Sequence, residues 1–559
     1  MLDASAIAAG FGQLAPDQLR AALDSFLPKG STSERTRAVE SALRSPIGQS
    51  LRHAMARWIV DEIVPVESLV PESYLRWRAP VREAMMYVVA HLSPGRLAPK
   101  LLEQIDLPID TTAEVRLLRL IAKVPGLQKL GQVIARNQHL RPALRVALAK
   151  LENGIRDVRP AEMRVIIEKD LGLQLKSFDV RIDPAILSEA SVSAVIRFTW
   201  KSPETGRRER GVFKVLKPHI PEYFAEDMDY LRGLAQYFGD RHHTYGFEAD
   251  LIPDTFRKVE RLLRHEVNFK REQKTLLEAW ALYHTIPGIR IPRVIRPLCT
   301  STITALTEEA GTKVTSAGAR LSSSDRQKLA EQLVEALIAI PLFAATPEAI
   351  FHGDPHAGNL LYHNRTRELT IIDWALRERL NREQRRHLAL LFLMVTLRDG
   401  VGTFHEIAAL SQHDIRGTSR RGQMMRALVT DFLAELPPSR LPSGADAMRL
   451  LERVAIKGIK FPSSLIMLSK VMFTLEGILG DIVGSDTAIG FTLVRQIAQH
   501  WLSNRSAFRS PLRTRDWLTL QCSALLYTGR LWVQWEQAIL NRLLTRKSIA
   551  APATTRARA

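Results

Sequence analysis

The chain has 559 residues, of which 46% are hydrophobic and 25% charged, an ordinary composition for a globular protein of about two to four domains. Lys and Arg exceed Asp and Glu by 78 to 59, and the resulting net charge of +19 favours anionic partners such as phosphate, acidic lipid or nucleic acid. Cys299 and Cys522 lie far apart and have no Cys or His neighbours in metal-binding spacing, so we expect inert thiols in a reducing compartment.

The termini and the longest apolar stretches carry little sign of a membrane-spanning protein. The N-terminus lacks the basic segment of a secretory signal, and no apolar stretch is long enough for an ordinary transmembrane helix. We therefore expect an intracellular, cytoplasmic chain without a signal peptide or a clear transmembrane span.

Residues 1–110 are predicted to form a helical N-terminal region. Apolar residues recur at three- and four-residue intervals over residues 51–66 and 80–92, which is typical of packing or docking helices. In the next region, 111–175, Lys129 and Gln132 lie three apart on a predicted helix and can point at one target, although such residues are usually only solvated.

A small antiparallel sheet is predicted to follow a helix over residues 160–174, which we expect to stop near Gly172. Strand-like segments cover residues 178–182, 191–200 and 210–216, the last two joined by a turn-rich hairpin. Lys214 interrupts the apolar third strand. A buried lysine needs a partner, so Lys214 is a candidate for holding nucleotide phosphates; the alternative is an edge strand from which it reaches solvent.

Residues 264–272 read as part of one long helix on which Glu266 and Glu272, six apart, face opposite sides and could serve two lysines. Further strands are predicted at 291–294 and 302–306, followed by a hinge at 307–311 and by helices from Ser322 onward. This order predicts a sheet-rich lobe, a hinge and a helical lobe, with a nucleotide bound in the cleft between the lobes.

Residues 351–373 carry the strongest chemical pattern. Asp354 is followed five residues later by Asn359, on a loop rich in Pro and Gly, and a predicted hairpin brings Asp373 back beside Asn359. Hard oxygen ligands without Cys favour Mg²⁺ bound together with phosphates, as in phosphoryl transfer. The alternative is that each residue caps a turn or ends a strand.

The C-terminal region, 501–559, holds ten Lys and Arg against two Asp and Glu. Its basic residues flank Trp517, Trp532 and Trp535, which suits a helix lying in a membrane interface, although a solvated basic face over a core helix fits equally well.

Taken in order, these residues resemble the motifs of the UbiB family of atypical kinases, also called AarF or ADCK proteins. Lys129 to Gln132 match the family's KxGQ signature, residues 188–195, with Ala190 and Ser191, resemble its Ala-rich nucleotide loop, and Lys214 matches its strand lysine. The remaining matches are Glu272 as the partner of that lysine, Glu266 as the start of the ExD motif, Asp354 as the catalytic-loop acid, and Asn359 and Asp373 as metal ligands.

The resemblance implies an α+β, two-lobed protein-kinase-like fold with extra N-terminal helices. Its regions would be 1–110, a KxGQ extension at 111–175, an N-lobe at 176–311, a C-lobe at 312–500 and the basic segment 501–559. It also implies an ATP-dependent phosphotransferase or ATPase that uses ATP and Mg²⁺ and supports ubiquinone-type isoprenoid-lipid metabolism at a membrane surface. Lys129 and Gln132 would roof the cleft and meet Glu266.

Several positions depart from the family pattern. Asn268 replaces the Asp of ExD, Glu189 and Ala194 differ from the Ala-rich loop, and Trp374-Ala375 replace Phe-Gly. Two other interpretations therefore remain: a small-molecule phosphotransferase of the aminoglycoside or choline kinase type, and an ATP-sensing pseudokinase scaffold. Nucleic-acid binding is not expected, because no recognition module accompanies the charge.

Overall fold

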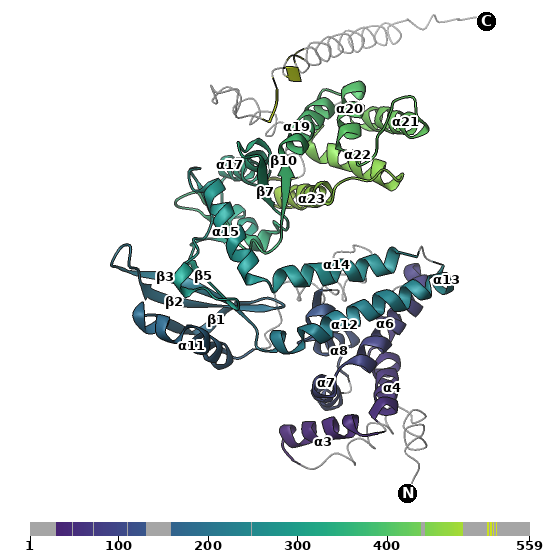
Figure 1. Ribbon diagram of the computed structural model, residues 1–559, viewed down its shortest axis with the longest axis vertical. Helices are drawn as coiled ribbons and strands as arrows, with labels where there is room; N and C mark the ends of the chain where they lie inside the picture. The colour runs from purple at the N-terminus through teal and green to yellow at the C-terminus, as the bar shows by residue number, and fades with distance from the viewer. Residues whose placement is uncertain are drawn as a thin grey trace, which may run out of the picture. The chain divides into compact units, whose positions relative to one another are not determined.

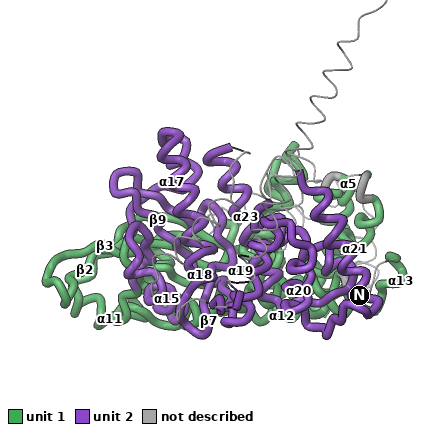
Figure 2. The backbone as a smooth tube through the Cα atoms, turned by 90° about the horizontal axis from the view of Figure 1, so that it is seen from above, with its two compact units in different colours: residues 1–273, 294–308 green, residues 274–293, 309–559 purple. Residues whose placement is uncertain are grey.

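The computed structural model describes residues 30–129, 158–484 and 511–521, apart from residues 47, 71, 109, 247–248, 438–441, 514, 517 and 519–520. The chain divides into two compact units (Figure 2). Unit 1 comprises residues 1–273 and 294–308, and unit 2 comprises residues 274–293 and 309–559. The division into five regions stays a prediction.

The first part of unit 1 is helical, as expected. Its helices (Figure 1) share one hydrophobic core, to which Met55, Leu97 and Leu234 contribute buried side chains. These helices are α3 (Thr32–Arg44), α4 (Gly48–Trp58), α5 (Val66–Leu69), α6 (Arg78–His91), α7 (Pro94–Asp106), α8 (Ala113–Ile121), α12 (His219–Asp240), α13 (His242–Tyr245) and α14 (Leu251–Glu266).

The second part of unit 1 is an antiparallel sheet with the strand order β1-β2-β3-β5. The strands are β1 (Arg181–Glu189), β2 (Ser193–Lys201), β3 (Arg208–Leu216) and β5 (Ile303–Thr307), and α11 (Pro160–Ser177) packs on the sheet through Ile167 and Leu171. The predicted hairpin between the second and third strands is confirmed.

Three boundary predictions in this region were wrong. The helix does not stop near Gly172, because that residue faces solvent while the opposite side of α11 is fixed on the sheet. The first strand starts at Arg181 and continues past Pro184 to Glu189, which is possible because β1 is an edge strand with register shifts. At 291–294 only Val294 forms an isolated bridge, and the nearby strand β4 covers Ile289–Arg290.

Unit 2 contains a second sheet with the order β4-β9-β8-β6 and a separate antiparallel pair, β7 with β10. The new strands are β6 (Thr312–Lys313), β7 (Glu348–His352), β8 (Leu360–His363), β9 (Glu368–Ile371) and β10 (Arg377–Asn381). Its helices are α16 (Val314–Gly318), α17 (Ser323–Val334), α18 (Ile340–Phe343), α19 (Arg382–Thr396), α20 (Gly400–Leu410), α21 (Arg420–Glu435), α22 (Gly444–Ile456) and α23 (Ser463–Val483). The helices predicted from Ser322 onward are present, and their apolar residues Leu329, Leu333 and Leu337 are buried.

Helix α15 (Phe269–Tyr283) contains the boundary between the units, which falls after Gln273. Mixed helices and sheets in both units confirm the α+β class. No helix among the described residues has the length and apolar character needed to cross a bilayer.

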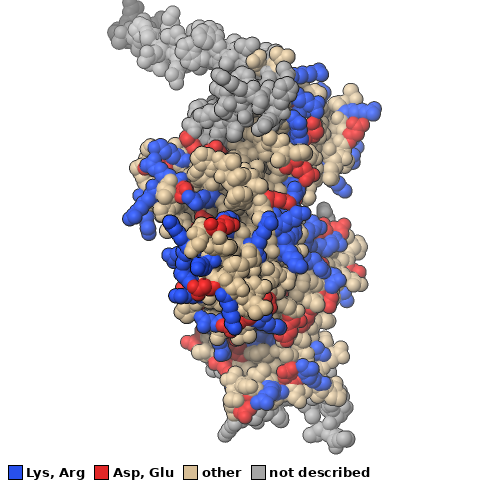
Figure 3. All heavy atoms as spheres, turned by 60° about the vertical axis from the view of Figure 1, so that its left-hand side comes forward, with Lys and Arg blue, Asp and Glu red and all other residues tan. Residues whose placement is uncertain are grey.

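Charged side chains of both signs are interspersed over the face drawn in Figure 3. Many form ion pairs, as Glu308 does with Arg210 at 2.8 Å and with Arg197 at 2.7 Å. Of the basic C-terminal region, only parts of residues 511–521 are described, and there Arg513 pairs with Glu383 at 2.8 Å. The three tryptophans of the predicted interfacial segment lie outside the described residues.

Candidate active site

Lys214 lies on β3, which is an inner strand between β2 and β5. Its neighbours Phe213 and Val215 are fully buried, and its Nζ donates to Glu272 Oε1 at 2.7 Å. The Glu272 side chain is 2% exposed and that of Lys214 is 13% exposed. The edge-strand alternative is therefore wrong, and the lysine–glutamate pair implied by the resemblance is present in unit 1.

Glu266 and Glu272 lie on two different helices, not on one. Helix α14 ends at Glu266, and α15 begins at Phe269. The separation arises at Asn268, whose Oδ1 accepts a hydrogen bond from the backbone N–H of Arg271 at 3.0 Å. Asparagine is a favoured residue at a helix N-terminus, so Asn268 starts the new helix where the apolar pattern alone predicted continuity.

Glu266 binds two groups at once. Its Oε1 accepts from Nζ of Lys129, and its Oε2 accepts from Oγ of Ser191 at 3.3 Å. Ser191, with Ala190, lies on the short turn between β1 and β2, where Ala190 N–H donates to Ser193 O at 2.8 Å. The expected contact of Lys129 with Glu266 is thus observed, and it reaches the predicted nucleotide loop. Gln132 lies outside the described residues.

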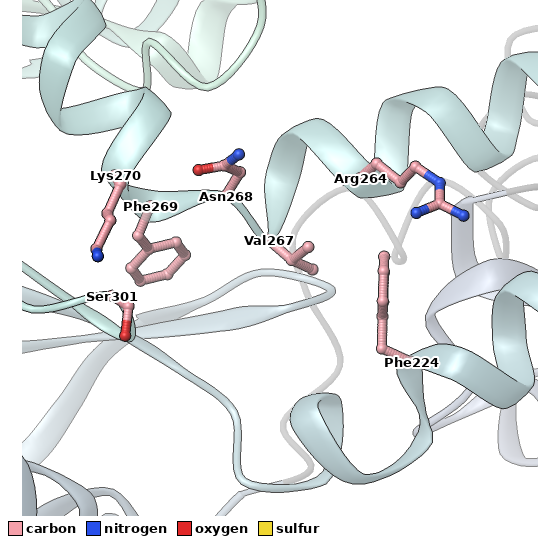
Figure 4. A pocket seen from close by; sticks show the side chains of 7 residues that line it. All are labelled: Phe224, Arg264, Val267, Asn268, Phe269, Lys270 and Ser301. Atoms are coloured by element: carbon pink, nitrogen blue, oxygen red, sulfur yellow. The ribbon is translucent and has the colours of Figure 1, made fainter.

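The Asn268 side chain accepts from the first turn of α15. It lies at the rim of a hollow of about 530 Å³ at the turn between α14 and α15, together with Arg264 and Lys270 (Figure 4). The Asn that replaces the family Asp therefore starts helix α15. The contact of Lys129 is made by Glu266 instead.

Glu189 is the residue whose charge was unexpected beside a phosphate-binding loop. Its carboxylate is 4% exposed and lies 3.2 Å from Nζ of Lys217, whose side chain is 1% exposed. The carboxylate is therefore turned into the protein onto a cation, where its charge is compensated.

The segment that carries Lys129 is anchored by a buried ion pair. Arg96 donates to Asp227 Oδ1 at 2.6 Å, and the second oxygen of Asp227 accepts from the backbone N–H of Gly126 at 3.2 Å. Arg96 also donates to Lys123 O at 3.1 Å. A side chain at position 126 would collide with the hydroxyl of Tyr230. The start of the helix bearing Lys129 is thus held against α7 and α12.

In unit 2, Asp354 and Asn359 lie on the tight loop that follows β7, as predicted. Residues 357–359 form a single 3₁₀ turn, and Asn359 Nδ2 donates to the backbone carbonyl of Asp354 at 3.1 Å. This bond fixes the amide and leaves its Oδ1 on the opposite side. Because Asn359 is 8% exposed, its orientation is well constrained.

The predicted hairpin between Asn359 and Asp373 is confirmed. Strands β8 and β9 pair in antiparallel register, and Ile372 N–H donates to Asn359 O at 2.9 Å. Asp373 follows with φ of +58°, a left-handed conformation that costs a non-glycine residue about 1 kcal/mol or more. Such a cost is typical of functional positions. Asp373 is an exposed residue.

His352 ties these two segments together. Its Nδ1 accepts from Asp354 N–H at 3.2 Å, while its Nε2 lies 2.9 Å from the carbonyl oxygen of Asp373. One nitrogen must accept and the other donate, so the ring is neutral. Burial lowers the pKa of His352, which keeps it neutral, and Trp374 packs against it edge-on with ring centres 5.0 Å apart.

Lys470 is a residue that the sequence interpretation passed over. It lies on α23, and its Nζ donates to Asp354 Oδ1 at 2.7 Å. The available signal was its position as the single basic residue in a helix of otherwise mainly apolar character. His352 was likewise noticed only as part of the spacing, although it connects both acid-bearing segments.

Among the residues that the structure describes, no three His, Cys, Asp or Glu side chains gather as metal ligands. The donor set of Asn359 and Asp373 nevertheless fits Mg²⁺, which takes one or two protein oxygens together with water and phosphate oxygens. The assignment of roles to all these residues stays a prediction.

A comparison with protein families matches a stretch that begins before Lys214, ends beyond Asp373 and leaves out Lys129. Residues 150–404 match the ABC1 atypical kinase-like domain. The chain is similar to that domain over slightly less than half of its length. The resemblance to UbiB proteins and the protein-kinase-like fold class are thereby confirmed.

Individual relatives of this kinase-like chain are distant. A probable protein kinase UbiB from Pasteurella multocida is 24% identical over 361 residues, which cover 63% of this chain and 67% of the relative. The uncharacterized protein sll1770 of Synechocystis is 25% identical over 395 residues, covering 70% of this chain and 65% of that protein. A solved structure, "The complex structure of Rv3197-erythromycin from Mycobacterium tuberculosis", aligns with a TM-score of 0.43 and 16% identity, covering 66% of this chain and 92% of that one.

Proposed function

We propose that the chain binds Mg-ATP and acts as an ATPase or as an ATP-dependent phosphotransferase. The observation that carries this proposal is the arrangement in unit 2, where Asn359 is bonded to the backbone of both Asp354 and Ile372 and Asp373 follows in a left-handed conformation. It combines one acid at the reacting group with two oxygen ligands for a cation, which is what phosphoryl transfer requires of a protein.

Each residue of this cluster has a separate role. Asn359 Oδ1 and the carboxylate of Asp373 would hold Mg²⁺, which would supply positive charge to neutralise the phosphates. Asp354 orients the attacking water or hydroxyl and accepts its proton. His352 connects the backbone of Asp354 to that of Asp373 through its two ring nitrogens and so holds the two segments together.

We also propose that the cluster in unit 1 binds a nucleotide. Lys214 binds the α- and β-phosphates, and Glu272 orients its ammonium. Lys129, held by Glu266, and Gln132 limit access to the nucleotide, while Ala190 and Ser191 line the phosphates. Because Glu189 is neutralised by Lys217, its charge does not oppose a bound phosphate.

The setting is proposed from the relatives and from the charge. A role in ubiquinone-type isoprenoid-lipid metabolism, at an anionic membrane surface, is supported by the UbiB names of relatives such as the Pasteurella protein and by the net charge of +19. The acceptor is then water, a lipid or another small molecule.

Asp373→Asn tests this function in purified full-length chain. We expect ATP turnover to fall by about 100-fold or more, because the substitution removes a charged Mg²⁺ ligand. Asp414→Asn is the matched control, since Asp414 is 80% exposed at the surface of the same unit. An unchanged rate in the Asp373 variant would refute the assignment.

The same assay separates the alternatives when it is run with anionic vesicles, neutral vesicles and no vesicles. Inorganic phosphate as the product indicates an ATPase, and phosphate on an added alcohol indicates a small-molecule phosphotransferase. Nucleotide-dependent thermal stabilisation without turnover under all three conditions would indicate an ATP-sensing scaffold.

A further inference from the structure

Lys470 has no role in the function proposed above, yet it contacts the acid at its centre. It is the one basic residue in the 21 residues of α23, and its ammonium lies 2.7 Å from Asp354 Oδ1. The two residues are 116 positions apart in sequence, so tertiary packing alone brings them together.

The position of this ammonium is fixed from both sides. Its neighbours on α23, Val471 and Met472, are buried, and Leu468 is 3% exposed. Helix α23 also packs against β10, the strand paired with the β7 strand that leads into Asp354. Lys470 is thus held beside the catalytic loop by the core of unit 2.

A purely structural role explains this arrangement poorly. Side chains that are 35% and 22% exposed form an ion pair that solvent screens, so it contributes little to stability. The lysine gains little stability there, and a neutral polar residue at position 470 would cost the fold little. Its distinctive property is the positive charge that it brings to the carboxylate that faces the reacting group.

We propose that Lys470 is a phosphate-binding residue that contacts the terminal phosphate of the bound nucleoside triphosphate while it remains bonded to Asp354. An ammonium carries three N–H donors, so it can hold a carboxylate and a phosphate oxygen at the same time. In phosphoryl transfer, charge spreads over the oxygens of the transferred group, and a fixed cation beside the acceptor acid stabilises it. This inference rests on the proposed function.

The test compares the affinities for Mg-ATP and Mg-ADP, measured by calorimetry on the full chain. In Lys470→Met we expect ATP binding to weaken by about 10- to 100-fold, the loss of one hydrogen bond to a charged group, while ADP binding changes less than about threefold. Retained ADP binding also shows that the variant is folded. Lys470→Arg keeps the charge and is expected to recover most of the ATP affinity.

Lys457→Met is the matched control, because Lys457 is exposed at the C-terminal end of α22 and its loss should leave both affinities unchanged. Equal weakening of ATP and ADP in Lys470→Met, or no change in either, would overturn the role of Lys470. If the unsubstituted chain binds ATP but does not turn it over, only the proposed enzymatic function is refuted. The ratio of the ATP and ADP affinities still measures the contact of Lys470 with the terminal phosphate, because binding requires no turnover. No binding of Mg-ATP by the unsubstituted chain would overturn both.

Discussion

Asp227→Asn should loosen the segment that carries Lys129. In the structure the two oxygens of Asp227 are divided between Arg96, at 2.6 Å, and the backbone N–H of Gly126, at 3.2 Å. An asparagine has one acceptor oxygen, so either the guanidinium or the amide loses its acceptor and faces an NH₂ group instead.

The cost follows from burial. The side chains of Arg96 and Asp227 are 3% and 0% exposed, so water cannot replace the lost partner. Removing one member of a buried pair costs about 3–5 kcal/mol. Glu226 lies 3.5 Å from Arg96 and compensates part of its charge, which places the expected loss near about 3 kcal/mol.

Asp229→Asn is the control on the same helix. Asp229 is 73% exposed and pairs only with Arg232, three residues away, so its loss should change stability by less than about 0.5 kcal/mol. Urea unfolding of the full chain, with the slopes of the transitions compared, measures both variants. Hydrogen exchange at residues 122–129 should accelerate in Asp227→Asn alone. Equal unfolding midpoints and equal exchange in the two variants would refute this account of the buried pair.

Two further predictions concern His352 and the Glu189–Lys217 pair. His352 in the unfolded chain binds a proton near pH 6.5, whereas burial lowers its pKa in the folded chain, so this residue makes the protein lose stability as pH falls from about 7 to 5. His352→Gln should therefore lose less unfolding free energy over that pH range. Equal pH dependence of the unfolding free energy in the two proteins would contradict a buried neutral ring. Lys217→Met should lower the unfolding free energy in urea by about 3 kcal/mol or more, because it removes the cation beside a buried carboxylate. Adding Glu189→Leu to Lys217→Met should recover most of that loss. A double variant as unstable as the single one would argue against the pair.

The candidate site in unit 2 could be predicted from sequence because its geometry is local. Asp354, Asn359 and Asp373 are connected by a tight turn and one short hairpin, and both features follow from Pro, Gly and alternating apolar residues. The structure confirms the hairpin register between Leu360 and Ile371. Lys470 could not be found in this way, because no local rule relates a lysine on a distant helix to this loop.

The two lysine–glutamate pairs show an intermediate case. Their members could be named from motifs, and two glutamates serving two lysines was a prediction from the sequence. The helix that was expected to carry both glutamates is in fact broken at Asn268, whose side chain caps α15. A polar cap outweighed an apolar pattern that continued through it, and periodicity does not report such a cap.

For this chain, the sequence by itself determined the motifs, the α+β order of elements and the hairpin that joins the metal-ligand candidates, because these depend on residues near one another in the chain. Only the tertiary structure decided that Lys214 lies on an inner strand, that the charge of Glu189 is turned onto Lys217, and that Lys470 reaches Asp354. Those outcomes depend on which distant side chains share a buried space, and burial is a property of the folded chain as a whole.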